Sequence, residues 1–159
     1  MLTLTAPHTP DHSLPRLLGS TKKRLGLSGA VALLKERALW KKDVVHYVSG
    51  QETTQGSNGW HPHYHLLIFH LGDLDVEKWY QSWAKACKDA GLGRPSRMHG
   101  LTLQPAESAA GYMAKWGLAS ESTGAHVKDA KHGNRAIWDI EQSAASGDLS
   151  TKNLLWQLS

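Results

Sequence analysis

Four short segments have the alternation, or the β-branched and aromatic content, that is typical of strands. In LTLT at 2–5, leucines alternate with threonines. VVHYVSGQETTQ at 44–55 and WHPHYHLLIFHL at 60–71 are separated by GSNG, whose residues favour a turn. These two segments are therefore predicted to form a β-hairpin. MHGLTLQ at 98–104 is a further strand candidate, and the proline that follows it ends the pattern.

Between and after these segments, apolar residues recur with the spacing of an α-helix. The clearest case is DVEKWYQSWAKACKDA at 75–90. From 14 to 40 the leucines follow helical spacing, but the pattern is interrupted at 26–29, which predicts two helices or one broken helix. AESAAGYMAKWGLA at 106–119 predicts a shorter helix, and 136–159 predicts a helical C-terminal extension.

The order of these elements is β, α, β, β, α, β, α. The hairpin makes the sheet at least partly antiparallel, and helices that alternate with strands cover one of its faces. We therefore predict an α+β fold. With 159 residues, of which 40% are hydrophobic, the chain is long enough to bury a core of its own, so 1–159 is predicted to be a single domain.

Composition narrows the function classes. No apolar run approaches the ~20 residues that a membrane span requires, so no membrane partner is expected. The first residues lack a basic segment followed by an apolar one, and Cys87 is the single cysteine, which together favour a reducing, cytoplasmic setting. The net charge of +4 is compatible with a polyanionic partner.

Ten histidines and seven tryptophans are the unusual feature of the composition. The helical spacing of Trp79 and Trp83 indicates core positions, whereas Trp60 suits either the core or base stacking.

The histidines matter through their spacing. His61, His63 and His65 alternate on one predicted strand, so their side chains share a face, with neighbouring members roughly 6.6 Å apart along the strand. Hairpin pairing across the GSNG turn brings Glu52 opposite this strand. Pro62 cannot donate to a strand ladder, which indicates an edge or an irregularity where the strand begins.

Two imidazoles and one carboxylate form a metal-ligand set that leaves coordination positions open. The predicted ligands are His63, His65 and Glu52. If a phosphate oxygen completes the coordination, Mg²⁺ or Mn²⁺ is expected, with Zn²⁺ as an alternative. A solvated histidine face without metal is the structural alternative.

A second chemical motif lies in the predicted helix at 106–119. Tyr112 and Lys115 are three residues apart and so share a helix face. The ammonium favours the phenolate form of the tyrosine, which is a nucleophile for a phosphodiester. Alternatively, Tyr112 belongs to an apolar core stripe with Met113 and Trp116.

Together, LTLT, QETTQGSNGWHPHYHLL and AAGYMAKW resemble the three ordered motifs of HUH endonucleases, in particular the plasmid rolling-circle replication initiators. The resemblance extends from Leu2 to about Lys131. It implies a single HUH nuclease domain with a central five-stranded antiparallel sheet, in which the histidine strand is central. It also implies a metal held by His63, His65 and Glu52.

The same resemblance implies an enzyme that nicks and rejoins single-stranded DNA through a covalent 5′-phosphotyrosine. Tyr112 matches the nucleophile and Lys115 its neighbour in the site. Trp116 stands where some initiators carry a second tyrosine, so a single-tyrosine enzyme is expected.

The expected partner is single-stranded or hairpin origin DNA, with a host helicase or polymerase as further partners. Lys128, Lys131 and Arg135 follow the tyrosine helix and are predicted to hold the DNA backbone, although a solvated loop explains them equally well. Two other functions remain open. One is the same chemistry in a mobilisation relaxase or a single-strand transposase. The other is a non-catalytic nucleic-acid-binding domain that contains structural zinc.

Overall fold

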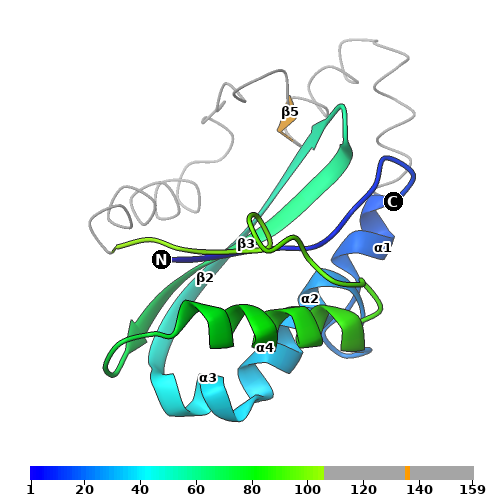
Figure 1. Cartoon of the computed structure of the whole chain (residues 1–159). Helices are drawn as coiled ribbons and strands as arrows, with labels where there is room; N and C mark the ends of the chain where they lie inside the picture. The colour runs from blue at the N-terminus through cyan, green and yellow to red at the C-terminus, as the bar shows by residue number, and fades with distance from the viewer. Residues whose placement is uncertain (106–134, 137–159) are drawn as a thin grey trace.

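The computed structural model describes residues 1–105 and 135–136. The strands are β1 (Leu2–Thr5), β2 (Val44–Gly56), β3 (Gly59–His70), β4 (Leu101–Leu103) and β5 (Arg135–Ala136). The helices are α1 (Leu14–Leu18), α2 (Gly26–Glu36), α3 (Ala38–Asp43) and α4 (Val76–Asp89). These helices cover one face of the sheet (Figure 1). The other face of β2 and β3 carries the predicted metal ligands.

All the strand pairs in the sheet are antiparallel, and the order across it is β4-β1-β3-β2-β5. Four strands form the body of the sheet, and β5 adds two residues beside the end of β2. The α+β class and the antiparallel sheet with flanking helices are therefore confirmed. The histidine strand, β3, lies between β1 and β2. β1 pairs with the middle of β3, from His63 to Leu66, so the residues at both ends of β3 extend beyond β1. At the start of the strand this pairing begins just after Pro62.

The predicted hairpin is confirmed, and its turn determines the register of the site. Gly56 pairs with Gly59, which leaves Ser57 and Asn58 as the loop. Gly59 has φ +84°, a left-handed conformation that glycine adopts without strain. A Cβ on Gly59 would also lie 2.8 Å from the Cα of Pro10, so the segment after β1 packs directly against this turn.

The core lies between the sheet and the helices. Leu4 and Leu66 from the sheet pack in one cluster with Leu27 of α2 and with Trp79 and Trp83 of α4. Both tryptophans are thus core residues, as predicted. Helix α4 is well formed because its apolar residues share one face and because the Asp75 side chain accepts hydrogen bonds from two backbone amides of the first turn.

Two smaller features complete the core. Trp60 is only 2% exposed and packs with Leu14 and Leu17 in a second cluster, so it is a core residue and not a stacking platform. Cys87 is buried in α4, and burial raises the pKa of its thiol.

Within the described part of the chain, no helix combines the length and the apolar character needed to cross a membrane.

The helical segment from 14 to 40 differs from the prediction. It forms three helices, and the break expected at 26–29 is wrong, because Gly26 is the first residue of α2. The break lies instead between α1 and α2. Gly19 and Gly26 meet there so closely that a Cβ on Gly26 would lie 2.6 Å from the Cα of Gly19. Glycine is thus needed at both positions because the two backbones touch, and helical periodicity in the sequence does not predict such a contact.

Candidate metal centre

The centre is built on the paired strands of the hairpin. Glu52 of β2 stands directly opposite His63 of β3, as predicted, and Gly50 stands opposite His65. The Glu52 Oε2 atom lies 3.3 Å from Nε2 of His63 and 3.2 Å from Nε2 of His65. One carboxylate oxygen therefore reaches both imidazoles, one straight across the hairpin and one diagonally.

Hydrogen bonds on the far side of each ring orient its Nε2 atom toward Glu52. The Nδ1 atom of His63 lies 3.3 Å from the carbonyl oxygen of His61. A carbonyl only accepts hydrogen bonds, so Nδ1 carries the proton and a neutral His63 ring presents a lone pair at Nε2. The Nδ1 atom of His65 lies 3.0 Å from Oγ1 of Thr3, and this hydrogen bond orients the second ring.

This donor set fits a divalent cation. Two imidazole nitrogens and a carboxylate oxygen, all within 4.8 Å of one another, converge on one point. Neutral imidazole lone pairs and a carboxylate repel one another unless a positive charge lies among them. Glu52, His63 and His65 could hold Mg²⁺ or Mn²⁺ through mixed nitrogen and oxygen ligands, and this set also suits Zn²⁺. With three protein ligands, positions remain for water or a substrate oxygen.

The three ligands differ in how far they are buried. The side chains of His65 and His63 are 6% and 14% exposed, whereas that of Glu52 is 33% exposed. The imidazoles are thus held in the sheet surface, while the carboxylate forms the open side.

Thr3 is a residue of the candidate centre that sequence reasoning missed. In LTLT, Leu2 and Leu4 are buried in the core, so Thr3 faces the opposite side, where it pairs in register with His65. The alternation of leucine and threonine in this strand is enough to predict which face of the sheet Thr3 occupies. Its partner depends on the pairing of β1 with β3, two strands that are far apart in sequence.

Replacing Thr3 with valine is expected to weaken Mn²⁺ binding about tenfold, because losing an outer hydrogen bond to a ligating histidine typically costs 10–100-fold in metal affinity. Valine has nearly the shape of threonine but cannot pair with Nδ1 of His65. Titration calorimetry with Mn²⁺ measures the change. Thr102→Val is the matched control, because Thr102 pairs with Thr3 on the neighbouring strand β4, whereas the described hydrogen bond to Nδ1 of His65 comes from Thr3. Equal affinities in Thr3→Val and wild type would contradict the role of Thr3.

His61, the third alternating histidine, is not part of the ligand group. Its Nδ1 atom lies 3.2 Å from Nε2 of His8, away from Glu52. Desolvation by burial, with smaller contributions from His8 and His63, lowers the pKa of His61 to about 4. His61 is therefore neutral at pH 7.

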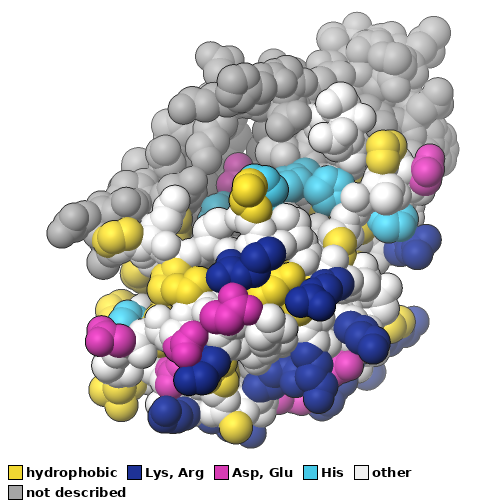
Figure 2. Space-filling view, viewed as in Figure 1, with side chains coloured by type: hydrophobic (Ala, Val, Ile, Leu, Met, Phe, Trp, Pro, Cys, Tyr) yellow, Lys and Arg dark blue, Asp and Glu magenta, His cyan; other side chains and the backbone are white. Residues whose placement is uncertain are grey.

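Among the described residues, His8 and His61 lie next to the histidine ligands of the centre. Figure 2 shows several histidine side chains side by side in a band, while most of the Lys and Arg side chains in this view lie in the region of the helices. The predicted DNA-binding cations Lys128 and Lys131 fall outside the described residues, as do Tyr112 and Lys115. Arg135 is described through its backbone, which pairs with Gln55 at the end of β2.

No protein-family model, curated protein or solved structure matches this chain. The assignment of a metal centre therefore rests on the converging ligands of β2 and β3.

Proposed function

We propose that this protein is a metal-dependent nicking and joining enzyme for single-stranded DNA, which initiates rolling-circle plasmid replication through a covalent 5′-phosphotyrosine. The observation that carries the proposal is the convergence of Nε2 of His63 and Nε2 of His65 on Oε2 of Glu52, at 3.3 and 3.2 Å. The strand order, with the histidine strand in the centre, supports the five-stranded sheet of an HUH endonuclease.

The residues of the centre hold and orient the cation. Thr3 and the carbonyl of His61 direct the two Nε2 atoms, and Glu52 closes the third side. When bound, the cation would polarise the scissile phosphate and offset its negative charge.

Tyr112 is the proposed nucleophile. Its phenolate oxygen forms a bond to the scissile phosphorus, and the bond from phosphorus to the 3′ oxygen breaks. The leaving 3′ oxygen takes up a proton and becomes the free 3′-OH that primes synthesis. Lys115 favours the phenolate form and offsets charge on the phosphate. Attack of a 3′-OH on the phosphotyrosine reverses the reaction and joins strands.

The proposed mechanism places a requirement on the segment that connects β4 to β5. These strands lie at opposite edges of the sheet, and the described helices occupy the core face. Tyr112 lies in the sequence between them. The proposal requires that the link bring Tyr112 to the face that carries Glu52, His63 and His65.

The test is capture of the covalent intermediate. The full chain is incubated with Mn²⁺ and a pool of labelled single-stranded DNA, and a protein–DNA adduct that resists denaturation is expected. Sequencing of the captured DNA identifies the cleavage site. An origin of replication supports the proposal, whereas a transfer origin or transposon ends support a relaxase or transposase. Absence of any adduct, with DNA binding intact, would contradict the proposed chemistry.

Chelation of the metal is expected to leave the protein folded. The ligands lie on the face of the sheet opposite the main core, which contains the leucines and tryptophans of the sheet and helices. The core therefore does not depend on the cation. Circular dichroism should keep its far-ultraviolet spectrum and a cooperative melting transition in EDTA, while adduct formation stops. Unfolding on chelation would instead indicate a structural zinc domain.

A further inference from the structure

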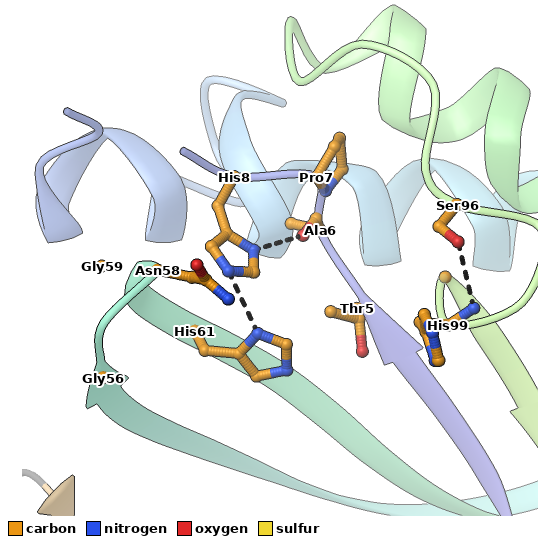
Figure 3. Close-up of a pocket in the computed structure, with 11 residues that line it drawn as sticks. Thr5, Ala6, Pro7, His8, Gly56, Asn58, Gly59, His61, Ser96 and His99 are labelled. Atoms are coloured by element: carbon orange, nitrogen blue, oxygen red, sulfur yellow. Dashed lines mark hydrogen bonds between the residues drawn. The ribbon is translucent and has the colours of Figure 1, made fainter. Parts of the chain in front are cut away.

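A cleft of about 480 Å³ adjoins the metal centre. Figure 3 shows His8, Asn58 and His61 on one side of it and Ser96 and His99 on the other. The first side combines the segment after β1 with the tip of the β2–β3 hairpin, and the second is the loop before β4. His61 connects the cleft to the centre, because its ring lies 5.4 Å from the ring of His63 between centroids.

A chain of hydrogen bonds determines what His61 offers to a ligand. The Nδ1 atom of His8 lies 3.2 Å from the carbonyl oxygen of Ala6, so His8 Nδ1 is the donor. The Nε2 atom of a neutral His8 is then an acceptor, and the Nδ1–H of His61 donates to it at 3.2 Å. The Nε2 atom of His61 is left as an acceptor. This wall of the cleft therefore presents the Nε2 atom of His61 as an acceptor, because the hydrogen bonds fix the tautomer of the ring.

The opposite wall is also held in place. The Oγ atom of Ser96 accepts hydrogen bonds from the backbone amides of Met98 and His99, at 3.2 and 3.3 Å. These bonds fold the loop into a tight turn that carries His99 to the cleft (Figure 3). Both walls are therefore preorganised for a ligand.

The lining decides the chemistry of the ligand. Among the residues that the structure describes, the lining includes no Lys, Arg, Asp or Glu, and its polar side chains are imidazoles, an amide and hydroxyls. These side chains suit a nucleobase better than a phosphate, because the edge of a base pairs with such donors and acceptors and its face stacks on imidazole. The volume lies in the range of small-ligand sites.

We propose that this cleft binds one base of the single-stranded DNA, next to the phosphate held at the metal centre, and so selects the sequence that is cut. This inference rests on the proposed function. Asn58 and His99 determine specificity, while His8 positions the His61 ring.

The experiment uses the full chain carrying Tyr112→Phe, so that binding is measured without covalent capture. A randomised single-stranded DNA pool is equilibrated with the protein in Mg²⁺, and the bound and unbound fractions are sequenced. One position of the bound register should show a strong base preference. Asn58→Ala and His99→Ala are each expected to reduce that preference about fivefold, the effect of one lost hydrogen bond.

His70→Ala is the matched control. His70 is an exposed histidine at the opposite end of β3 and does not line the cleft. Since Asn58 and His99 are also exposed, all three variants should fold, and melting curves check this. The control should keep the preference of the parent chain.

The outcomes separate the two proposals. If the pool binds but the base preference is absent or survives both cleft substitutions, the cleft inference is wrong and the nicking function stands. If free deoxynucleoside monophosphates shift the nitrogen resonances of His8 and His61 while the pool shows no preference, the cleft takes free nucleotides and the inference is wrong. A pool that does not bind contradicts the proposed function and, with it, the inference.

Discussion

Replacing Tyr112 with phenylalanine is expected to abolish the covalent protein–DNA adduct and to lower strand cleavage at least about a thousandfold, a loss typical of removing a catalytic nucleophile. Phenylalanine keeps the ring and its packing but has no oxygen to attack phosphorus. The metal ligands lie on β2 and β3 and are not altered. Metal affinity should therefore be unchanged while the adduct disappears. Gel mobility under denaturing conditions and calorimetry with Mn²⁺ measure the two quantities.

Tyr47→Phe is the matched control for this substitution. Tyr47 is 37% exposed on β2, on the face of the strand opposite Glu52, and it packs against Trp40. Removing its hydroxyl should leave the adduct intact. An adduct that persists in Tyr112→Phe, and that mass spectrometry maps to another side chain, would show that the nucleophile is wrongly assigned.

Replacing His65 with alanine is expected to lower Mn²⁺ affinity by more than about a hundredfold, because the loss of a direct ligand exceeds the 10–100-fold typical of an outer-shell loss. His65 is the most buried member of the ligand group, and it contacts both Glu52 and Thr3. Cleavage of DNA should fall with metal occupancy. Electron paramagnetic resonance of free Mn²⁺ gives the affinity, and the adduct assay gives the activity.

Two further variants make this result interpretable. Glu52→Gln keeps the size of the side chain but removes its charge, and Glu52 is partly exposed, so folding should be preserved while metal affinity falls. His61→Ala removes the neighbouring histidine that bonds to His8 instead of Glu52, and it should keep the metal affinity of the wild type. Equal losses in His61→Ala and His65→Ala would contradict the assigned ligands.

The ligand group was predictable because its geometry is local. A hairpin with a two-residue loop determines its own register, so the spacing from Glu52 across the turn to His63 leads directly to their pairing. The alternation of His63 and His65 then places both rings on one face. The core roles of Trp79 and Trp83 were predictable for the same reason, since helical spacing is a short-range property.

The remaining features depend on contacts between distant segments. Thr3 contacts His65 only because β1 pairs with β3 across the intervening helices. The cleft needs three segments, the stretch around His8, the hairpin tip at Asn58 and the loop at His99. The break between α1 and α2 follows from the close approach of two glycines. No periodicity in the sequence carries this information.

By itself, the sequence determined an α+β fold, a histidine-bearing hairpin and the three side chains that can bind a metal. These follow from backbone periods and turn chemistry, which act over a few residues. The tertiary structure alone decided that Thr3 holds His65 and that His61 pairs with His8 beside a cleft. Those features arise when apolar faces are buried together, because this packing brings strands and loops that are distant in sequence into contact.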